Sequence, residues 1–158
     1  MSIFVTAGSH IYVGGPMARK RTPHELSDFA AQSWTEVAWW ENAGEFGDES
    51  QSVTADYIAE KRTQKFKGTR NAGDPAMVFG LDYEDAGQAI LKVAETLPSN
   101  YAFKIVFDDA PEGGTPSERY FIGLVMSARE ALDQANNVAK LNVTIGLNSN
   151  TVRVDAAA

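Results

Sequence analysis

The hydrophobic and polar positions along most of the chain follow the period of β-strands. Residues 101–109, YAFKIVFDD, place large apolar side chains at every second position, which is typical of a strand with one buried face. Comparable β-rich runs, separated by turn residues, lie at 3–6, 10–13, 63–69, 75–83, 119–130 and 137–148. This pattern predicts about six to eight strands in an antiparallel sandwich or barrel.

One segment, at about residues 82–97, has the period of an amphipathic helix instead. Its apolar side chains recur every three or four positions along one stripe: Tyr83, Ala86, Ile90, Val93, Ala94 and Leu97. Asp82 is of the residue type that caps a helix N-terminus, and Glu84 and Asp85 suit the positive end of the helix dipole. Pro98 ends the helix. The sequence therefore predicts a mainly β fold with one flanking α-helix.

Residues 26–44 do not decide between helix and strand. Five apolar side chains there have helical spacing: Leu26, Phe29, Ala30, Trp34 and Val37. The stretch WTEVAWW at 34–40, however, is rich in residues that favour strands, and a turn-forming Asn-Ala-Gly sequence follows it at 42–44. From the residues alone, the two interpretations have equal support.

The order of charges between residues 41 and 70 is unusual. The first part, 41–60, has acidic and no basic side chains: Glu41, Glu45, Asp48, Glu49, Asp56 and Glu60. The second part, 61–70, has basic and no acidic side chains: Lys61, Arg62, Lys65, Lys67 and Arg70. The basic part of one copy could meet the acidic part of the next. Equally, the two parts could form a hairpin whose charges neutralise each other within one chain.

The basic run also raises the hypothesis of a phosphate-binding loop, because Gly68 and Gly73 accompany it. The chain carries a formal net charge of −7 and has a pI of about 4.8, so the field of the whole molecule repels polyphosphate. We therefore expect no general affinity for nucleic acid or for anionic membranes.

The residue inventory offers little catalytic chemistry. No cysteine is present, which excludes disulfides, thiolate metal sites and a cysteine nucleophile. His10 and His24 have no second nitrogen or sulfur ligand near them in the sequence, which argues against a zinc site. No nucleophile elbow, P-loop or dinucleotide-binding motif occurs. We predict a protein that is not an enzyme and that binds no cofactor and no metal ion.

The three tryptophans allow two interpretations. Trp34, Trp39 and Trp40 could form a platform on which nucleic-acid bases stack. In an acidic chain, packing in the core or at a contact between subunits is the favoured interpretation.

The sequence also bears on location. No apolar run approaches the roughly 20 residues that cross a bilayer, and the N-terminal MSIFVTAGSH has no basic region ahead of an apolar one. We expect a protein that is made in the cytoplasm and stays there or assembles from there.

Several of these stretches, taken in order, resemble the major tail tube protein of long-tailed, lambda-like (siphovirus) bacteriophages. The resemblance runs from about Ile11 to about Arg153. The first two matching stretches are LSDF and WTEVAWWENAGEFGDES. The second of them fits the strand that enters the long loop of that family. It continues through KFKGTRNAGDPAMVFGLDYEDAGQAIL, YAFKIVFDD, FIGLVMSARE and LNVTIGLNS.

The resemblance implies a small β-sandwich or barrel flanked by a helix, and it interprets residues 34–40 as strand. It implies one tail-tube domain over residues 1–158 with N-terminal and C-terminal extensions and no additional C-terminal immunoglobulin-like domain. Residues of about 42–70 would form an arm onto neighbouring subunits. The candidate interface residues on this arm are Phe46, Asp48, Glu49, Asp56, Tyr57, Ile58, Lys61, Arg62, Lys65, Phe66, Lys67 and Arg70.

The implied function is structural: hexameric rings stack into the hollow tail tube of a virion, and DNA passes through without specific binding. The implied partners are further copies of the chain and other tail proteins, namely the tape measure, tail tip and terminator. The protein would be made in the host cytoplasm and would not contact a membrane. A net charge of −7 per copy suits a wall along which polyphosphate slides.

Two other classes of protein remain as alternatives. One is a tail terminator or head–tail connector built on a similar β-scaffold. The other is a small-ligand-binding β-barrel, which predicts a monomer with an apolar cavity and fewer charges between residues 41 and 70.

Overall fold

A curled antiparallel sheet forms the body of the protein, in a computed structural model that describes residues 3–158. Seven strands lie in the order β2-β1-β7-β8-β9-β6-β3, and an eighth, β10, pairs with β8. Each pairing is antiparallel, which confirms the predicted architecture. The strands are β1 (His10–Pro16), β2 (Thr35–Glu36), β3 (Trp40–Asn42), β6 (Ala76–Gly80), β7 (Tyr101–Val106), β8 (Glu118–Ala131), β9 (Lys140–Leu147) and β10 (Val152–Val154).

Both faces of the sheet are covered, so the protein has two apolar layers. In β7, Phe103 and Ile105 point into the larger layer, which also takes up the buried side of the helix α1 (Ala86–Thr96). Ala102, between them in sequence, points into the smaller layer with Phe29 and Ile122. Burying a large apolar side chain contributes about 1.5–3 kcal/mol, so both layers add to the stability of the sheet.

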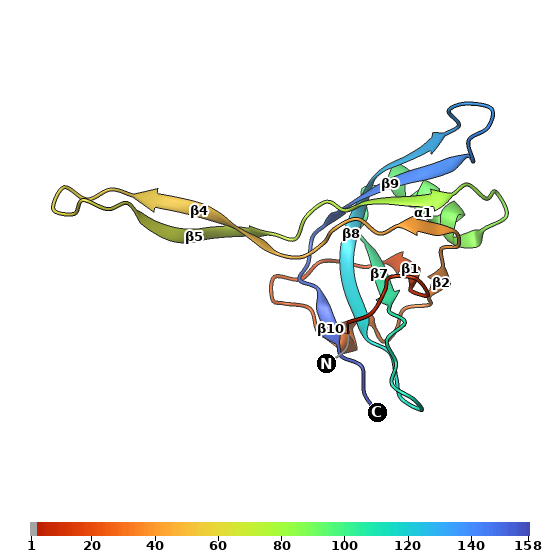
Figure 1. Cartoon of the computed structure of the whole chain (residues 1–158), viewed down its shortest axis with the longest axis horizontal. Coiled ribbons are helices and arrows are strands. Elements are labelled where there is room, and N and C mark those ends of the chain that lie inside the picture. Colours follow the sequence, from red (N-terminus) through yellow and green to blue (C-terminus); the bar gives the residue numbers. More distant parts are fainter. Residues whose placement is uncertain (1–2) are drawn as a thin grey trace.

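The two edge strands of the row are neighbours in sequence, which forces the sheet to roll. β2 ends at Glu36 and β3 begins at Trp40. The four peptide units between these residues span at most about 14 Å. In a flat sheet of seven strands the two edges would lie roughly 29 Å apart. The sheet is accordingly a curled half-barrel, with α1 packed beside β8 and β1 (Figure 1).

The helix confirms the prediction for residues 82–97, but it begins later than Asp82. The N-cap is Asp85, which has an extended backbone (φ −74°, ψ 119°). Its side-chain carboxylate accepts the N–H of Gln88 at 3.0 Å. Asp82 instead closes a turn, because its carboxylate accepts the N–H of Glu84 at 2.9 Å. The sequence offers two aspartates three positions apart as candidate N-caps, and the second one has the N-cap conformation.

The ambiguous segment 26–42 contains both helical and strand structure. A 3-10 helix, η1 (Leu26–Phe29), accounts for the helical spacing at its start. The strand interpretation of 34–40 is confirmed at β2 and β3, but the two strands are separated by 37–39. Trp39 has a left-handed backbone conformation (φ 63°), which interrupts the strand there.

One predicted strand is wrong, and two strands lie outside the predicted β-rich runs. Residues 3–6 are not a strand, although their composition favours one. The tail contains β10, because Val152 and Val154 pack against the smaller apolar layer. The polar stretch at 45–60 contains a strand that alternation did not indicate, β4 (Glu49–Ala55), because most of its side chains face solvent on both sides.

β4 pairs with β5 (Gln64–Asn71) in a separate two-stranded sheet, and we call residues 49–71 the arm. The arm projects from one side of the body (Figure 1). Strands rise about 3.3 Å per residue, so the eight residues of β5 extend roughly 26 Å. The prediction of a long inter-strand arm at about 42–70 is confirmed.

Candidate assembly surfaces

The base of the arm is fixed to the body by an aromatic contact, and an ion pair closes it. The ring of Phe46, just before β4, lies 5.7 Å from the ring of Phe121 in the larger apolar layer. The guanidinium of Arg70, near the end of β5, pairs with the carboxylate of Asp48 at 2.8 Å. Of the predicted interface residues, Phe46 therefore packs in the core of its own protomer, and Asp48 and Arg70 contact each other.

One face of the arm is apolar. Val53 and Phe66 lie directly opposite each other in the β4–β5 register, and both side chains are about half exposed. Gly68 lies beside them, and a Cβ at this position would approach the Val53 side chain to 3.0 Å. Cross-strand apolar pairs of this kind stabilise a hairpin, but an isolated two-stranded sheet leaves the pair open to solvent.

The opposite face of the arm is basic. Lys65 faces Thr54 across the hairpin, and Lys67 faces Ser52, so neither lysine has an acidic partner on β4. Among residues 3–158, Arg70 is the one basic side chain of the arm that forms an ion pair. The acidic residues lie at the base and at the tip: Asp48, Glu49, Asp56 and Glu60. The hairpin does not neutralise itself, so the alternative of internal charge compensation is wrong for all but the Asp48–Arg70 pair.

The tip of the arm, residues 56–63, combines apolar, acidic and basic side chains, with Asp56 and Glu60 exposed beside the cations. Tyr57 is half exposed and Ile58 is fully exposed, although both are large and apolar. Lys61 and Arg62 are exposed on the returning side of the turn. The turn is held by a hydrogen bond from the N–H of Glu60 to the carbonyl of Tyr57 at 3.0 Å. An ordered turn thus presents two large apolar groups, two cations and two carboxylates to solvent.

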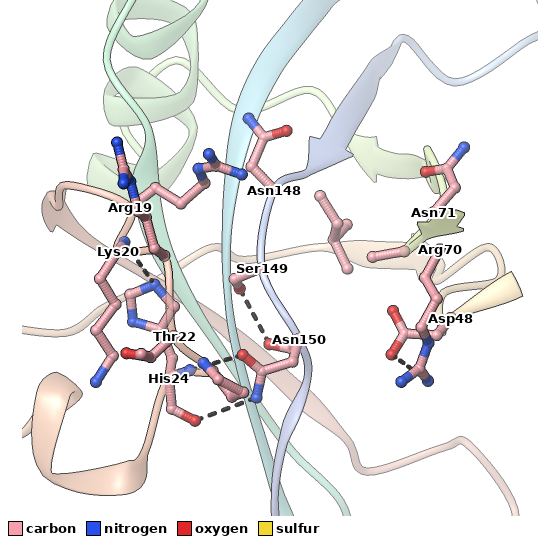
Figure 2. Close-up of a pocket in the computed structure, with 14 residues that line it drawn as sticks. Arg19, Lys20, Thr22, His24, Asp48, Arg70, Asn71, Asn148, Ser149 and Asn150 are labelled. Atoms are coloured by element: carbon pink, nitrogen blue, oxygen red, sulfur yellow. Dashed lines mark hydrogen bonds and ion pairs between the residues drawn. The ribbon is translucent and has the colours of Figure 1, made fainter. Parts of the chain in front are cut away.

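A basic pocket of about 410 Å³ lies between the base of the arm and the loop at 17–25 (Figure 2). Arg19 and Arg21 come from the loop, and Arg70 comes from the arm. Asn148 and Asn150, after β9, form the wall between them. Because Arg70 is already paired with Asp48, the pocket carries its unpaired positive charge on the loop side.

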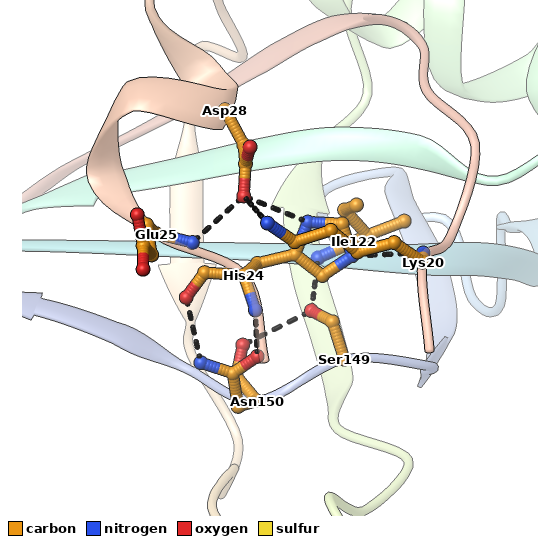
Figure 3. A network of polar contacts seen from close by, with 7 residues as sticks. All are labelled: Lys20, His24, Glu25, Asp28, Ile122, Ser149 and Asn150. Carbon is orange, nitrogen blue, oxygen red and sulfur yellow. Dashed lines mark hydrogen bonds and ion pairs between the residues drawn. The ribbon is translucent and has the colours of Figure 1, made fainter. Parts of the chain in front are cut away.

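His24 anchors this loop to the body (Figure 3). Its backbone N–H donates to the side-chain carbonyl of Asn150 at 2.7 Å, and the amide of Asn150 donates to the His24 carbonyl at 3.1 Å. The hydroxyl of Ser149 accepts the N–H of Ile122 in β8 at 2.9 Å. Asn150 and Ser149 therefore bridge the loop to the centre of the sheet.

The imidazole of His24 is buried, and burial lowers its pKa. Its Nε2 accepts the backbone N–H of Lys20 at 3.4 Å, and its Nδ1 lies 3.5 Å from the carboxylate of Asp28. Asp28 is itself paired with the Lys20 ammonium at 2.6 Å, and that hydrogen bond lowers the pKa of Asp28. Lys20 and Asp28 are thus paired with each other without protonation of His24.

A polar network at the N-terminus of α1 holds the connection between β2 and β3. The carboxylate of Asp85 accepts the N–H of Ala38 at 3.2 Å. The buried Gln88 amide donates to the carbonyls of Ala38 and Gly80, at 3.2 and 2.7 Å, and accepts the N–H of Asp82 at 3.0 Å. Gln88 therefore ties three backbone segments together where the rolled sheet closes.

The three tryptophans occupy different environments. Trp34 packs in the smaller apolar layer, 5.8 Å from the Tyr120 ring, and Trp40 packs against the larger layer. Trp39 is 66% exposed, and its indole N–H donates to Asp82 at 2.9 Å, which lowers the pKa of that carboxyl. Two of the three have the expected role in packing, and the third lies at the surface beside α1.

Within residues 3–158, no group of three or more His, Asp or Glu side chains is placed to hold a metal ion. In the same part of the chain, no helix has the length and hydrophobicity needed to cross a bilayer.

Sequence reasoning placed the candidate interface on the arm and missed the basic pocket beside it. The run Arg19-Lys20-Arg21 was a visible signal for the loop side of that pocket. Its proximity to Arg70 depends on the anchoring of the loop by Asn150, more than a hundred positions away in the sequence. No local pattern carries this information.

Comparison with solved structures shows which fold this is. A protein of the anti-feeding prophage baseplate superposes with a TM-score of 0.70 over 98% of this chain and 98% of its own, at 10% identity. The sheath/tube terminator of the extracellular contractile injection system PVC gives 0.69, again over 98% of both chains, at 9% identity. The SPP1 tail tube protein gives 0.63, over 92% of this chain and 77% of its own, at 12% identity.

At the level of sequence, no protein-family model and no curated protein matches the chain. The chain thus has the fold of tail tube and tube-terminating proteins, which confirms the predicted tail-tube-like architecture.

Proposed function

We propose that the chain is a structural subunit of a phage-type tail tube, and that it assembles as hexameric rings stacked into a hollow conduit. The observation that carries this proposal is the fold shared with tail tube and terminator proteins over nearly the whole chain. In keeping with it, the arm leaves the body and exposes apolar and basic groups that contact no body strand in the part of the chain that the structure describes. A homo-oligomer would cover these groups.

The six-fold symmetrised structure of the anti-feeding prophage baseplate supports a hexameric ring. The proposed interface residues are those of the arm: Glu49, Asp56, Tyr57, Ile58, Lys61, Arg62, Lys65, Phe66 and Lys67. At the base of the arm, Phe46, Asp48 and Arg70 act by fixing its direction. Residues 1–158 act in this proposal as one tail-tube domain.

The net charge of −7 supports a role as a wall that does not bind DNA. A ring of such protomers repels polyphosphate, so a genome can slide through its lumen. The protein would be made in the host cytoplasm and would belong to the tail of a long-tailed phage. It would contact the tape measure, tail tip and terminator there, and it would have no catalytic role.

A second candidate function is that of a terminator at the end of such a tube. It is supported by the coverage of 98% of both chains with the PVC sheath/tube terminator. A small-ligand-binding barrel has less support, because the interior is filled by Phe79, Phe103 and Phe121, all fully buried.

Negative-stain electron microscopy of the purified protein, alone and seeded with tail tips, tests the proposal. A tube subunit should give rings of uniform bore or long tubes, whereas a terminator should give single rings that do not extend. A protein that stays monomeric under every seeding condition would contradict both functions.

A further inference from the structure

The basic pocket holds two guanidinium groups that have no acidic partner. Arg19 and Arg21 both line it, both are exposed, and neither forms an ion pair within residues 3–158. Lys20, between them in sequence, is paired with Asp28 at 2.6 Å. Side chains of like charge repel each other, so this pair of arginines favours the approach of a negatively charged group.

The charge balance of the pocket lining leads to the same two residues. Four cations and one carboxylate line the pocket: Arg19, Lys20, Arg21, Arg70 and Asp48. The Arg70–Asp48 pair, at 2.8 Å, and the pairing of Lys20 with Asp28 account for two of the cations. Glu25 follows on the same loop but does not line the pocket. The concave surface therefore keeps two uncompensated positive charges in a chain whose net charge is −7.

The ligand that this arrangement fits is a carboxylate. A guanidinium presents parallel N–H groups whose spacing matches the two oxygens of a carboxylate. The loop that carries both arginines is held in place, because its His24 exchanges two hydrogen bonds with Asn150. The donors are thus positioned before a partner arrives, which lowers the entropic cost of binding.

The connection between β7 and β8 supplies carboxylates without cations. Residues 107–117, FDDAPEGGTPS, contain three acidic residues and no basic one, and we call them the acidic loop. Asp109 is engaged by the N–H and hydroxyl of Ser117, at 2.7 and 2.6 Å. Asp108 and Glu112 are exposed and form no ion pair within residues 3–158. The loop therefore carries two free carboxylates, as many as the pocket has free guanidinium groups.

The acidic loop is also shaped to enter a concave site. It projects from the body on the side away from the arm (Figure 1). Its turn is ordered, because the N–H of Gly114 donates to the carbonyl of Pro111 at 2.8 Å and Gly113 has a left-handed backbone (φ 75°). Two glycines directly follow Glu112, so the tip is narrow and its backbone can approach another surface closely.

Other acidic groups of the chain fit the pocket less well. Asp82 and Asp85 accept hydrogen bonds at the N-terminus of α1. Asp56 and Glu60, at the tip of the arm, lie beside two cations, so that tip has no net charge to match. Arg119, which follows the acidic loop on β8, leaves that loop negative because it donates to the Glu118 carbonyl at 2.9 Å and stacks on a phenylalanine ring.

The acidic loop and the pocket lie apart in one protomer. The pocket lies at the base of the arm, and no residue of 107–117 lines it. A contact between these two different surfaces therefore joins two copies. Such a contact is heterologous, and heterologous contacts produce rings when they close and filaments when they do not.

We propose that the acidic loop of one copy docks in the basic pocket of a second copy. The carboxylate of Glu112 enters between Arg19 and Arg21, and Asp108 adds negative charge at the base of the same loop. The proposal rests on the proposed function, because it assigns one contact within an assembly of this chain. The faces of the arm at 53–67 lie outside this contact.

A charge swap tests the contact. Arg21→Glu alone and Glu112→Arg alone each place like charges together, so each should raise the protein concentration needed for assembly by about tenfold or more. The double variant Arg21→Glu/Glu112→Arg restores the attraction and keeps the net charge at −7, because the two reversals cancel. It should assemble within about threefold of the wild-type concentration.

The matched control combines Arg21→Glu with Glu84→Arg, at an exposed glutamate outside the contact. Its net charge is also −7, and it should assemble as poorly as Arg21→Glu alone. Sedimentation velocity measures assembly, and circular dichroism should show the same folded protomer for every variant. A Glu112 swap that restores assembly no better than the Glu84 control overturns the docking and leaves the tube function intact. Wild-type protein that never assembles overturns both proposals.

Carbodiimide coupling gives an independent measurement. The reagent takes up the water that is lost when an amine and a carboxylate in contact form an amide. Arg21→Lys keeps the charge and introduces an amine, which should become joined to Glu112 of another copy in assembled protein, as mass spectrometry of the linked peptides would show. Adding Glu112→Gln to the same chain should abolish the product. Assembled protein that gives no such linked peptide contradicts the docking.

Discussion

Replacing Gln88 by leucine tests whether the network at the N-terminus of α1 holds the rolled sheet closed. Gln88 is 1% exposed. Its amide donates to the carbonyls of Gly80 and Ala38 and accepts the N–H of Asp82, at 2.7, 3.2 and 3.0 Å. Leucine has a similar volume and no polar group, so the substitution removes three hydrogen bonds without leaving a large cavity.

The expected loss of stability follows from these three bonds. Each hydrogen bond contributes a net of about 0.5–1.5 kcal/mol, and the backbone groups that lose their partner are too buried to become fully hydrated. We expect the free energy of unfolding to fall by about 3 kcal/mol. For a chain of 158 residues, this corresponds to a decrease in Tm of about 6–12 °C.

Urea unfolding of the monomer, followed by tryptophan fluorescence, measures this change. Trp39 and Trp40 lie next to Ala38, so opening of the connection between β2 and β3 should alter their emission. Ala89→Leu is the matched control, because it places the same side chain on the exposed side of α1 and should change stability by less than about 0.5 kcal/mol. A loss below about 1 kcal/mol for Gln88→Leu would refute the role assigned to the network.

Two further predictions concern the arm and the loop at 17–25. Reversing the charge of Lys65 and Lys67 to glutamate should impair ring formation in sedimentation velocity and leave the circular dichroism of the monomer unchanged; unaltered polymerisation would exclude both lysines from the interface. Burial lowers the pKa of His24, so the unfolded chain takes up a proton near pH 6.5 that the folded protein does not. The free energy of unfolding should therefore decrease between pH 7.5 and pH 5, and His24→Gln should remove part of that decrease; identical slopes for both proteins would contradict this account.

The body of the fold was predictable from sequence wherever one side of an element is buried. The alternation of Phe103 and Ile105 is a direct consequence of the strand period. The apolar stripe predicted for α1 is not the buried face: Tyr83, Ala86, Val93 and Leu97 are exposed, and the helix buries Gly87, Gln88, Leu91 and Ala94. β4 was not predictable, because most of its side chains face solvent and its pattern has no apolar period. The N-cap was placed at Asp82 rather than Asp85, since both are aspartates and only the backbone conformation distinguishes them.

The candidate assembly surfaces were predictable only in part. The charge order at 41–70 located the arm, because it is a property of consecutive residues. The pairing of β4 with β5 decides which charges meet, and it places Lys65 and Lys67 opposite Thr54 and Ser52 instead of acids. The basic pocket depends on tertiary packing between distant segments, so a pattern along the chain does not reveal it.

The position of the arm in the chain has a consequence for how this protein can vary. β3 and β6 pair with each other, with Trp40 opposite Phe79, so the whole arm is an insertion within one hairpin of the body. The entropic cost of closing a loop grows only with the logarithm of its length. The arm can therefore lengthen, shorten or change its side chains while the sheet beneath it keeps its register. The body and the arm are thus built by separate segments of the chain, which leaves one segment free to diverge while the other is held constant.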